Sequence, residues 1–119
     1  MPISAYDSLL FKNIFGTERI RDIFDDKAYT RRCVDVEAAL AVAESKCGVI
    51  PSATGEKIAS TLRDVDLDFE RLSSETEIVG YPILPLVRQL SEACDDDVGG
   101  YVVSLANRDI RLILLEKMG

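Results

Sequence analysis

The chain has 119 residues, of which 47% are hydrophobic and 29% are charged, and its formal net charge is −7. This length and this balance are typical of a single soluble domain with one modest core. The acidic excess argues against nucleic acid or an anionic membrane as a partner, because both are bound by clustered Lys and Arg.

The first predicted helix is the segment TERIRDIF, which begins at Thr17. Thr17 is a suitable N-cap, because its hydroxyl can accept a hydrogen bond from the first turn. Ile20, Ile23 and Phe24 then form an apolar stripe along the helix.

A longer helix is predicted from about Asp26 to Cys47, with Asp25 and Asp26 capping its start. Gly48 is the residue expected just past a helix end, and the proline at position 51 prevents simple continuation. The apolar residues that recur at spacings of three and four, and that we expect to form one buried face, are Cys33, Val36, Leu40, Ala43 and Cys47.

Two further helices are predicted before a break in the chain. Ser52 or Thr54 begins the first, and Asp66 or Asp68 caps the second. Their apolar positions are Ile58, Ala59, Leu62 and Val65 in the first, and Phe69, Leu72, Thr76 and Val79 in the second.

The break is Gly80-Tyr81-Pro82, because proline disfavours a helical conformation in the residue before it. Pro85 suits the first turn of the next helix, whose apolar residues include Leu86, Leu90 and Cys94. Residues 95–100, with the sequence DDDVGG, are predicted to be a loop. No alternating strand pattern longer than a few residues is present, so we expect an all-α fold, a small domain of about five to six helices.

A last helix is predicted from Leu105 to Met118, with Ser104 as its N-cap. Its apolar residues spread around most of the helix, so it must be buried on several sides, between other elements or against a second chain. The residues that we expect to mediate association are Leu105, Ile110, Leu112 and Leu115.

Three segments, in order, resemble the fumarase/aspartase superfamily: RDIFDDKAYTRRCVDVEAALAVAESKCGVIP, ETEIVGYPILPLVRQLSE and GGYV. The likeness covers roughly residues 17–102 and is strongest to the branch of 3-carboxy-cis,cis-muconate cycloisomerase and adenylosuccinate lyase. It implies a small helical N-terminal domain, which in the family continues into a long helical bundle and assembles into a tetramer with shared active sites. We therefore divide the chain into a lyase-family-like domain, 1–102, and a divergent helical tail, 103–119.

The family places a His-x-Gly-Ala-Thr/Ser motif after the segment that matches GGYV, and later a loop, Gly-Ser-Ser-x-Met-Pro-x-Lys-x-Asn, that provides the catalytic base. This sequence continues instead with VSLAN from Val103 and contains no histidine. Elimination and cycloisomerisation need a positioned base and stabilisation of a carbanion-like intermediate. We therefore expect no catalytic residue in the chain and no independent family activity.

The change of sequence at Val103-Ser104 has two interpretations. This dipeptide can be encoded by GTGAGT or GTAAGT, which resemble a eukaryotic intron donor read in frame, so the chain can be a splice variant. The alternative is a frameshift or a truncated gene copy. The sequence of the genomic locus separates the two.

The N-terminal segment, the apolar runs and the cysteines indicate the compartment of the protein and whether it binds a metal. The opening MPISAYDSLLFK lacks the basic segment and apolar core of a secretory signal, and no apolar run reaches the ~20 residues of a membrane span. Cys33, Cys47 and Cys94 lack metal-ligand spacing and are expected to be buried thiols in a reducing compartment. Asp95, Asp96 and Asp97 are interpreted as a solvated loop rather than a metal site. We expect a cytoplasmic protein without cofactors.

The candidate ligand contacts are Thr76, Gly80 and Tyr81, because the family resemblance implies that this neighbourhood approaches substrate. The alternative is a helix-breaking turn with Tyr81 packed against the core. Three functions stay open: association with itself or with a full-length homologue, an active lyase or cycloisomerase completed by a missing C-terminal portion, and a new role at this turn with a dicarboxylate-like small molecule.

Overall fold

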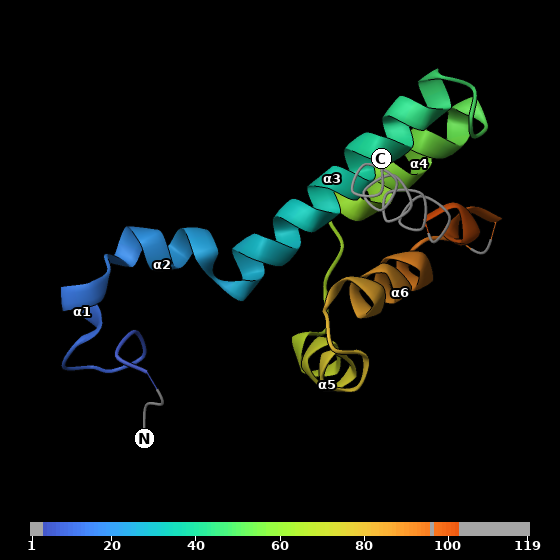
Figure 1. The fold of residues 1–119 in the computed structure, drawn as a ribbon. Helices are drawn as coiled ribbons and strands as arrows, with labels where there is room; N and C mark the ends of the chain where they lie inside the picture. Colours follow the sequence, from blue (N-terminus) through green and yellow to red (C-terminus); the bar gives the residue numbers. More distant parts are fainter. Residues whose placement is uncertain (1–3, 96, 103–119) are drawn as a thin grey trace, which may run out of the picture. The chain divides into compact units, whose positions relative to one another are not determined.

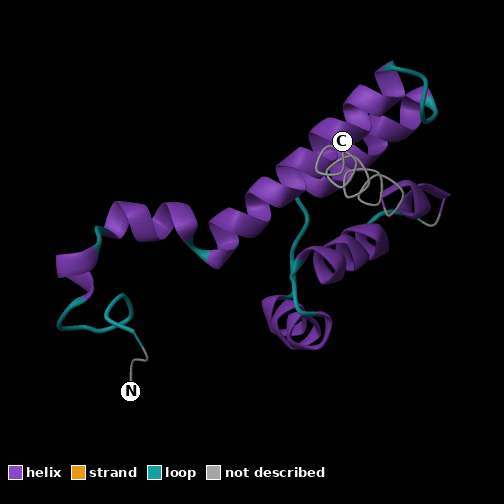
Figure 2. Ribbon diagram, in the orientation of Figure 1, coloured by secondary structure: helices purple, strands orange, loops and turns teal. Residues whose placement is uncertain are grey.

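The computed structural model describes residues 4–95 and 97–102, which form helices joined by turns and contain no strand (Figure 2). The predicted all-α fold is confirmed. Two compact units divide the chain, residues 1–32 and residues 33–119, and their boundary falls within one helix. The predicted division at residue 102 and the predicted tail helix, with Leu105, Ile110, Leu112 and Leu115, lie outside the described residues and stay predictions.

The first unit contains a short helix that the sequence did not predict, α1 (Lys12–Phe15), and the predicted one, α2 (Glu18–Phe24). The Thr17 hydroxyl accepts a hydrogen bond from the backbone N–H of Ile20 at 3.3 Å, which confirms the predicted cap. Neither helix contains a buried residue. The predicted apolar stripe of α2 exists, but the described residues leave it uncovered.

The helix α3 (Asp26–Lys46) has the predicted bounds to within one residue. Its cap is Asp25, whose carboxylate accepts a hydrogen bond from the backbone N–H of Ala28 at 2.6 Å. A carboxylate at this position also interacts favourably with the positive end of the helix dipole. The start of α3 therefore follows from local sequence.

The predicted buried face of α3 was only partly correct, because Cys33 and Leu40 are half-buried against the core, whereas Val36 and Ala43 are exposed. The side chains that are buried are instead Thr30, Val34, Glu37, Ala41 and Ser45. At 100° per residue, the predicted and observed faces are centred roughly 120° apart. Val36, from the predicted face, is 59% exposed. Because the stretch from residue 38 to 43 reads AALAVA, the helix is apolar on nearly every side, and spacing alone did not identify the face that this chain covers.

The helix α4 (Ser52–Arg63) runs alongside α3 (Figure 1). The two helices approach closely at Gly55, where a Cβ atom would lie 2.5 Å from the Ala41 carbonyl oxygen and would overlap the Ser45 side chain. Real Cβ atoms do not come this close to other atoms, so a residue without a side chain is required at this crossing.

The remaining helices are α5 (Phe69–Val79), α6 (Ile83–Ala93) and a helical segment at 97–102. Asp68 caps α5, and Gly80 ends it in the left-handed region with φ of 93°. Elements from α3 to residue 102 share one hydrophobic core. Its buried members are Val34, Ala41, Ile58, Leu62, Leu72, Leu86, Val87, Leu90, Cys94, Val98 and Val102.

The predicted loop at 95–100 was wrong, because residues 97–102 are helical. The Asp95 carbonyl oxygen accepts hydrogen bonds from the N–H groups of Val98 at 2.9 Å and Gly99 at 2.8 Å, which starts this helix. A Cβ atom on Gly99 would lie 2.6 Å from the Ser91 carbonyl oxygen. This glycine permits a close approach of residues 97–102 to α6, whereas the sequence predicted that it lies in a loop.

The three cysteines differ in environment. Cys94 is buried, Cys33 is half-buried and Cys47 is exposed. The prediction of three buried thiols was therefore wrong for Cys47, because α3 ends one residue earlier and Cys47 lies in the following turn.

Candidate functional site

The three candidate ligand contacts lie at the carboxyl end of α5. The Thr76 hydroxyl donates a hydrogen bond to the Leu72 carbonyl oxygen at 2.6 Å. The Thr76 carbonyl oxygen in turn accepts from the Gly80 N–H at 2.7 Å. The positive φ of Gly80 is a conformation that side chains disfavour, so glycine is suited to end the helix at this point. The helix end thus brings Thr76 and Gly80 together.

Tyr81 follows this helix end directly, and its side chain is 45% exposed. Within the described part of the chain its hydroxyl makes no hydrogen bond. The helix-breaking turn is present, but Tyr81 does not pack into the core. A ligand at this turn would find a free phenol at Tyr81 and only hydroxyl lone pairs at Thr76, because the Thr76 proton is used within α5.

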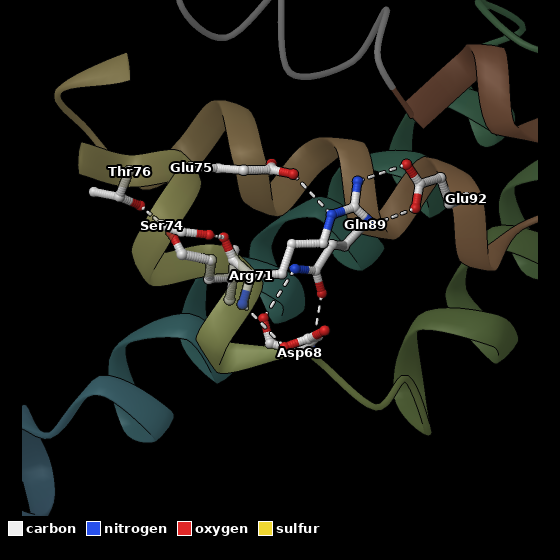
Figure 3. Close-up of polar contacts among 8 residues, drawn as sticks. Asp68, Arg71, Ser74, Glu75, Thr76, Gln89 and Glu92 are labelled. Carbon is white, nitrogen blue, oxygen red and sulfur yellow. Dashed lines mark hydrogen bonds and ion pairs between the residues drawn. The ribbon is translucent and has the colours of Figure 1, made fainter. Parts of the chain in front are cut away.

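Arg71 makes three charged hydrogen bonds, two of which link α5 to α6 and one of which stays within α5 (Figure 3). Its two terminal nitrogens donate to the two carboxylate oxygens of Glu92 at 2.6 and 2.9 Å. Its Nε donates to Glu75 Oε1 at 2.7 Å. The hydrogen bonds to Glu92 and Glu75 raise the pKa of Arg71. The hydrogen bonds from Arg71 lower the pKa of Glu92. Because two carboxylates already neutralise it, this guanidinium is a poor anion site.

Gln89 fixes the start of α5 against α6. Its side chain is buried among apolar residues of α6, and its Oε1 accepts from the Asp68 N–H at 2.9 Å. Its Nε2 donates to the Asp68 carbonyl oxygen at 3.0 Å, so one amide satisfies both backbone groups of Asp68. The Asp68 carboxylate accepts from the Arg71 N–H at 3.0 Å (Figure 3). Every polar group in this contact thereby has a partner.

Glu75 is the incomplete member of the cluster. Its Oε1 accepts from Arg71, but its Oε2 is buried and has no hydrogen-bond partner in the part of the chain that the structure describes. A buried carboxylate oxygen without a donor is unfavourable. This oxygen would be satisfied by a donor from another chain, a further segment or a ligand.

Asp95 and Asp97 contact the ammonium group of Lys57. Lys57 Nζ lies 2.9 Å from an oxygen of Asp95 and 3.3 Å from one of Asp97. Hydrogen bonds to these two carboxylates raise the pKa of Lys57. Among the described residues there is no group of three His, Cys, Asp or Glu side chains suited to a metal ion.

The contacts of Arg71 with Glu92 and of Gln89 with Asp68 were not predicted from the sequence. One signal was available: Gln89 is a polar residue beside Leu90 on the apolar face of α6, which often marks a buried hydrogen-bonded group. The pairing of Arg71 with Glu92 depends on which helices pack together. No local pattern predicts it.

No protein-family model matches the chain. An uncharacterized protein of Schizosaccharomyces pombe is 44% identical over 85% of this chain and 23% of its own length. Trans-aconitate decarboxylase 1 of Mycosarcoma maydis is 35% identical over 75% of this chain and 18% of its own length. The 3-carboxy-cis,cis-muconate cycloisomerase of Acinetobacter baylyi is 34% identical over 80% of this chain and 22% of its own length.

A crystal structure of fumarate lyase from Mesorhizobium sp. BNC1 matches 80% of this chain, with a TM-score of 0.70 and 36% identity. The chain is homologous to lyases of the fumarase/aspartase superfamily. This confirms the resemblance predicted from sequence. The chain spans between 18% and 25% of the length of these superfamily relatives. No helix within the described ranges combines the length and apolar character needed to cross a membrane.

Proposed function

We propose that the described helices act by association, binding a second copy of the chain or a full-length superfamily lyase, and that they are not a self-sufficient catalyst. The observation that carries this proposal is a second apolar face on α3. Val36 is 59% exposed and Ala43 on the same side is also exposed, whereas Cys33 and Leu40 at the edge of this side are half-buried against the core. An apolar surface of this kind is typical of a site that another chain covers.

The unsatisfied carboxylate oxygen of Glu75 supports the same proposal. It lies in α5, away from the exposed side of α3 in sequence, and it needs a donor that the described residues do not provide. These relatives are about four to six times longer than the matched segment, so their matched domains have much more chain available to pack on. One partner would thus cover the exposed side of α3 and supply a hydrogen-bond donor to Glu75.

The test compares two valine substitutions. Val36→Asp places a charge on the exposed face of α3, whereas Val49→Asp makes the same change at a valine that is 51% exposed in the turn after α3. Aspartate and valine have similar helix propensities, so both variants should fold. We expect Val36→Asp to weaken association at least roughly tenfold, because it removes apolar burial and adds a charge to desolvate.

Association is measured by light scattering after size exclusion and by co-purification with the full-length Acinetobacter cycloisomerase. Val49→Asp should behave as the unsubstituted chain does. A strictly monomeric chain that also ignores the full-length homologue would contradict the proposal. Equal effects of the two substitutions would show that the α3 face is not the contact.

A second candidate function is that of one part of an active lyase or cycloisomerase, completed by the remaining polypeptide. The names of the relatives and their greater length favour it. The assay mixes the chain with the Acinetobacter cycloisomerase lacking its matched N-terminal segment and measures cycloisomerase activity. Recovered activity supports complementation. Binding without activity supports association alone.

A third candidate, dicarboxylate binding beside Thr76, Gly80 and Tyr81, is favoured by the exposed phenol of Tyr81. The neutralised guanidinium of Arg71 weighs against it. Titration with fumarate or succinate, followed by NMR, tests this role. Shifts that disappear in Thr76→Val and Tyr81→Phe would support it, and the absence of shifts would exclude it.

A further inference from the structure

A second uncovered surface lies on α2, in the first unit. It consists of Ile20, Ile23 and Phe24, which we name the α2 stripe. Ile20 is 50% exposed and Phe24 is 78% exposed, whereas Ile23 between them is half-buried. An isolated helix of this length gains little from its own hydrogen bonds, so its order depends on burial of such a stripe.

The charges of α2 are arranged around this stripe. At 100° per residue, Arg19 and Arg21 flank it on its two sides, whereas Glu18 and Asp22 lie on the opposite side of the helix. Arg19 is exposed and forms no ion pair within the described residues. Arg21 donates to the Lys12 carbonyl oxygen at 3.2 Å and to an amide oxygen of Asn13 at 3.0 Å, so no carboxylate neutralises it. A matching surface must therefore be apolar and edged by carboxylates.

The outer side of α5 has one exposed apolar residue beside two carboxylates. It presents Glu70, Ser74, Glu77 and Ile78, which we name the α5 face, and Ile78 is 86% exposed. Glu70 and Glu77 lie on one side of Ile78, at positions one heptad apart. Neither glutamate forms a hydrogen bond or an ion pair within the ranges that the structure describes.

The charge balance of the two units points in the same direction. The chain has 14 basic and 21 acidic residues. Residues 1–32 contain six basic and five acidic residues, and residues 33–119 contain the other eight basic and sixteen acidic residues. The first unit is thus slightly basic and the second strongly acidic. Attraction between units of different copies is favoured over attraction between like units.

We propose that the α2 stripe of one copy binds the α5 face of a second copy, with Arg19 placed beside Glu77 and Phe24 against Ile78. This inference rests on the association role proposed above and adds its partner and its surface. In a two-fold symmetric dimer the contact forms twice, because each copy offers both surfaces. The exposed apolar residues of α2 and α5 are then buried by the same event.

The experiment reverses one charge on each surface. Arg19→Glu and Glu77→Arg each place like charges in both copies of the contact, and because the loss counts twice, each should weaken self-association by about tenfold. An equimolar mixture of the two variants should form a heterodimer as tightly as the unsubstituted chain. In that mixture the introduced carboxylate at position 19 of one copy meets the introduced guanidinium at position 77 of the other, and the second contact keeps its original pair.

The control is Glu56→Arg, which makes the same charge change at an exposed position of α4 and should leave self-association unchanged. Sedimentation velocity at two salt concentrations measures the dissociation constants, and circular dichroism checks that each variant keeps its helices. Higher salt should weaken the unsubstituted dimer and have less effect on the two reversed variants.

The inference would be overturned if both reversals left the dimer unchanged, or if the mixture of the two variants did not recover the affinity of the unsubstituted chain. The association role would stand in either case. A reversal that lowers the melting temperature of a monomeric chain would show that α2 binds α5 of its own copy, which also overturns it. A chain that neither self-associates nor binds a full-length homologue would contradict the association role itself.

Discussion

Two neighbouring glycines allow a matched test of how the end of the core is packed. Gly99 and Gly100 both lie in the helical segment 97–102, and neither has a positive φ. A Cβ atom on Gly99 would lie 2.6 Å from the Ser91 carbonyl oxygen, whereas one on Gly100 would meet nothing within 4 Å. Alanine at the two positions therefore changes helix propensity equally but changes packing at only one.

The expected magnitudes follow from these contacts. Alanine in place of glycine within a helix contributes up to about 1 kcal/mol of stability, which Gly100→Ala should realise. At Gly99 the contact is with backbone, which cannot turn away, so overpacking costs about 1–3 kcal/mol. The added methyl group would also push the segment 97–102 away from α6. This movement weakens the 2.8 Å hydrogen bond from the Ser91 hydroxyl to the Gly99 carbonyl oxygen, which contributes about 1 kcal/mol. Gly99→Ala should therefore be about 2–4 kcal/mol less stable than Gly100→Ala.

Thermal and urea unfolding followed by circular dichroism measure this difference. For a domain of this size, 1 kcal/mol corresponds to about 4–8 °C, so the two melting temperatures should differ by at least about 8 °C. Gly99→Ser is a further check, and it should be at least as destabilising as Gly99→Ala. Equal melting temperatures for the two alanine variants would refute the close approach of this segment to α6.

Gln89→Met should lower the free energy of unfolding by about 1–3 kcal/mol, because the part-buried N–H and C=O of Asp68 both lose their hydrogen-bond partner. Urea titration measures this, and no loss would mean that water replaces the amide. The pKa of Glu92 is lowered in the folded chain, so its contribution to stability is present above its ordinary pKa of 4.5 and is lost as the pH falls below that value. Glu92→Gln should therefore flatten the decline of the melting temperature on acidification, and an unchanged decline would contradict this. A thiol reagent should label Cys47 first and Cys94 last, because Cys94 is buried and desolvation raises its pKa; mass spectrometry of a time course shows the order, and early labelling of Cys94 would contradict the packing.

Local chemistry explains what the sequence predicted well. Helix starts at Glu18 and Phe69 follow from the capping side chains of Thr17 and Asp68, which need only their own first turn. The end of α5 likewise follows from the left-handed φ of Gly80. These features involve residues within four positions of one another, so they can be read without knowledge of the packing.

Features that depend on tertiary contacts were missed. Gly99 was predicted to lie in a loop, because a glycine in sequence does not reveal whether it permits a turn or a close approach. The ion pair of Arg71 and Glu92 joins residues 21 positions apart. The candidate ligand contacts at the end of α5 do not include either residue, so they did not predict this pair. In both cases the deciding contact is with another helix.

The partly correct face predicted for α3 and the proposed function have the same origin. A helix that is apolar on nearly every side is stable only if more than one side is buried, and the described residues cover the side that includes Val34 and Ala41. The side that includes Val36 shows the spacing of a buried face, but the described residues cover it only in part, at Cys33 and Leu40. The sequence pattern therefore fits two interfaces, one inside this chain and one that a partner would complete. If that is correct, a charge at Val34 should unfold the domain, whereas a charge at Val36 should leave its melting unchanged and weaken only its association.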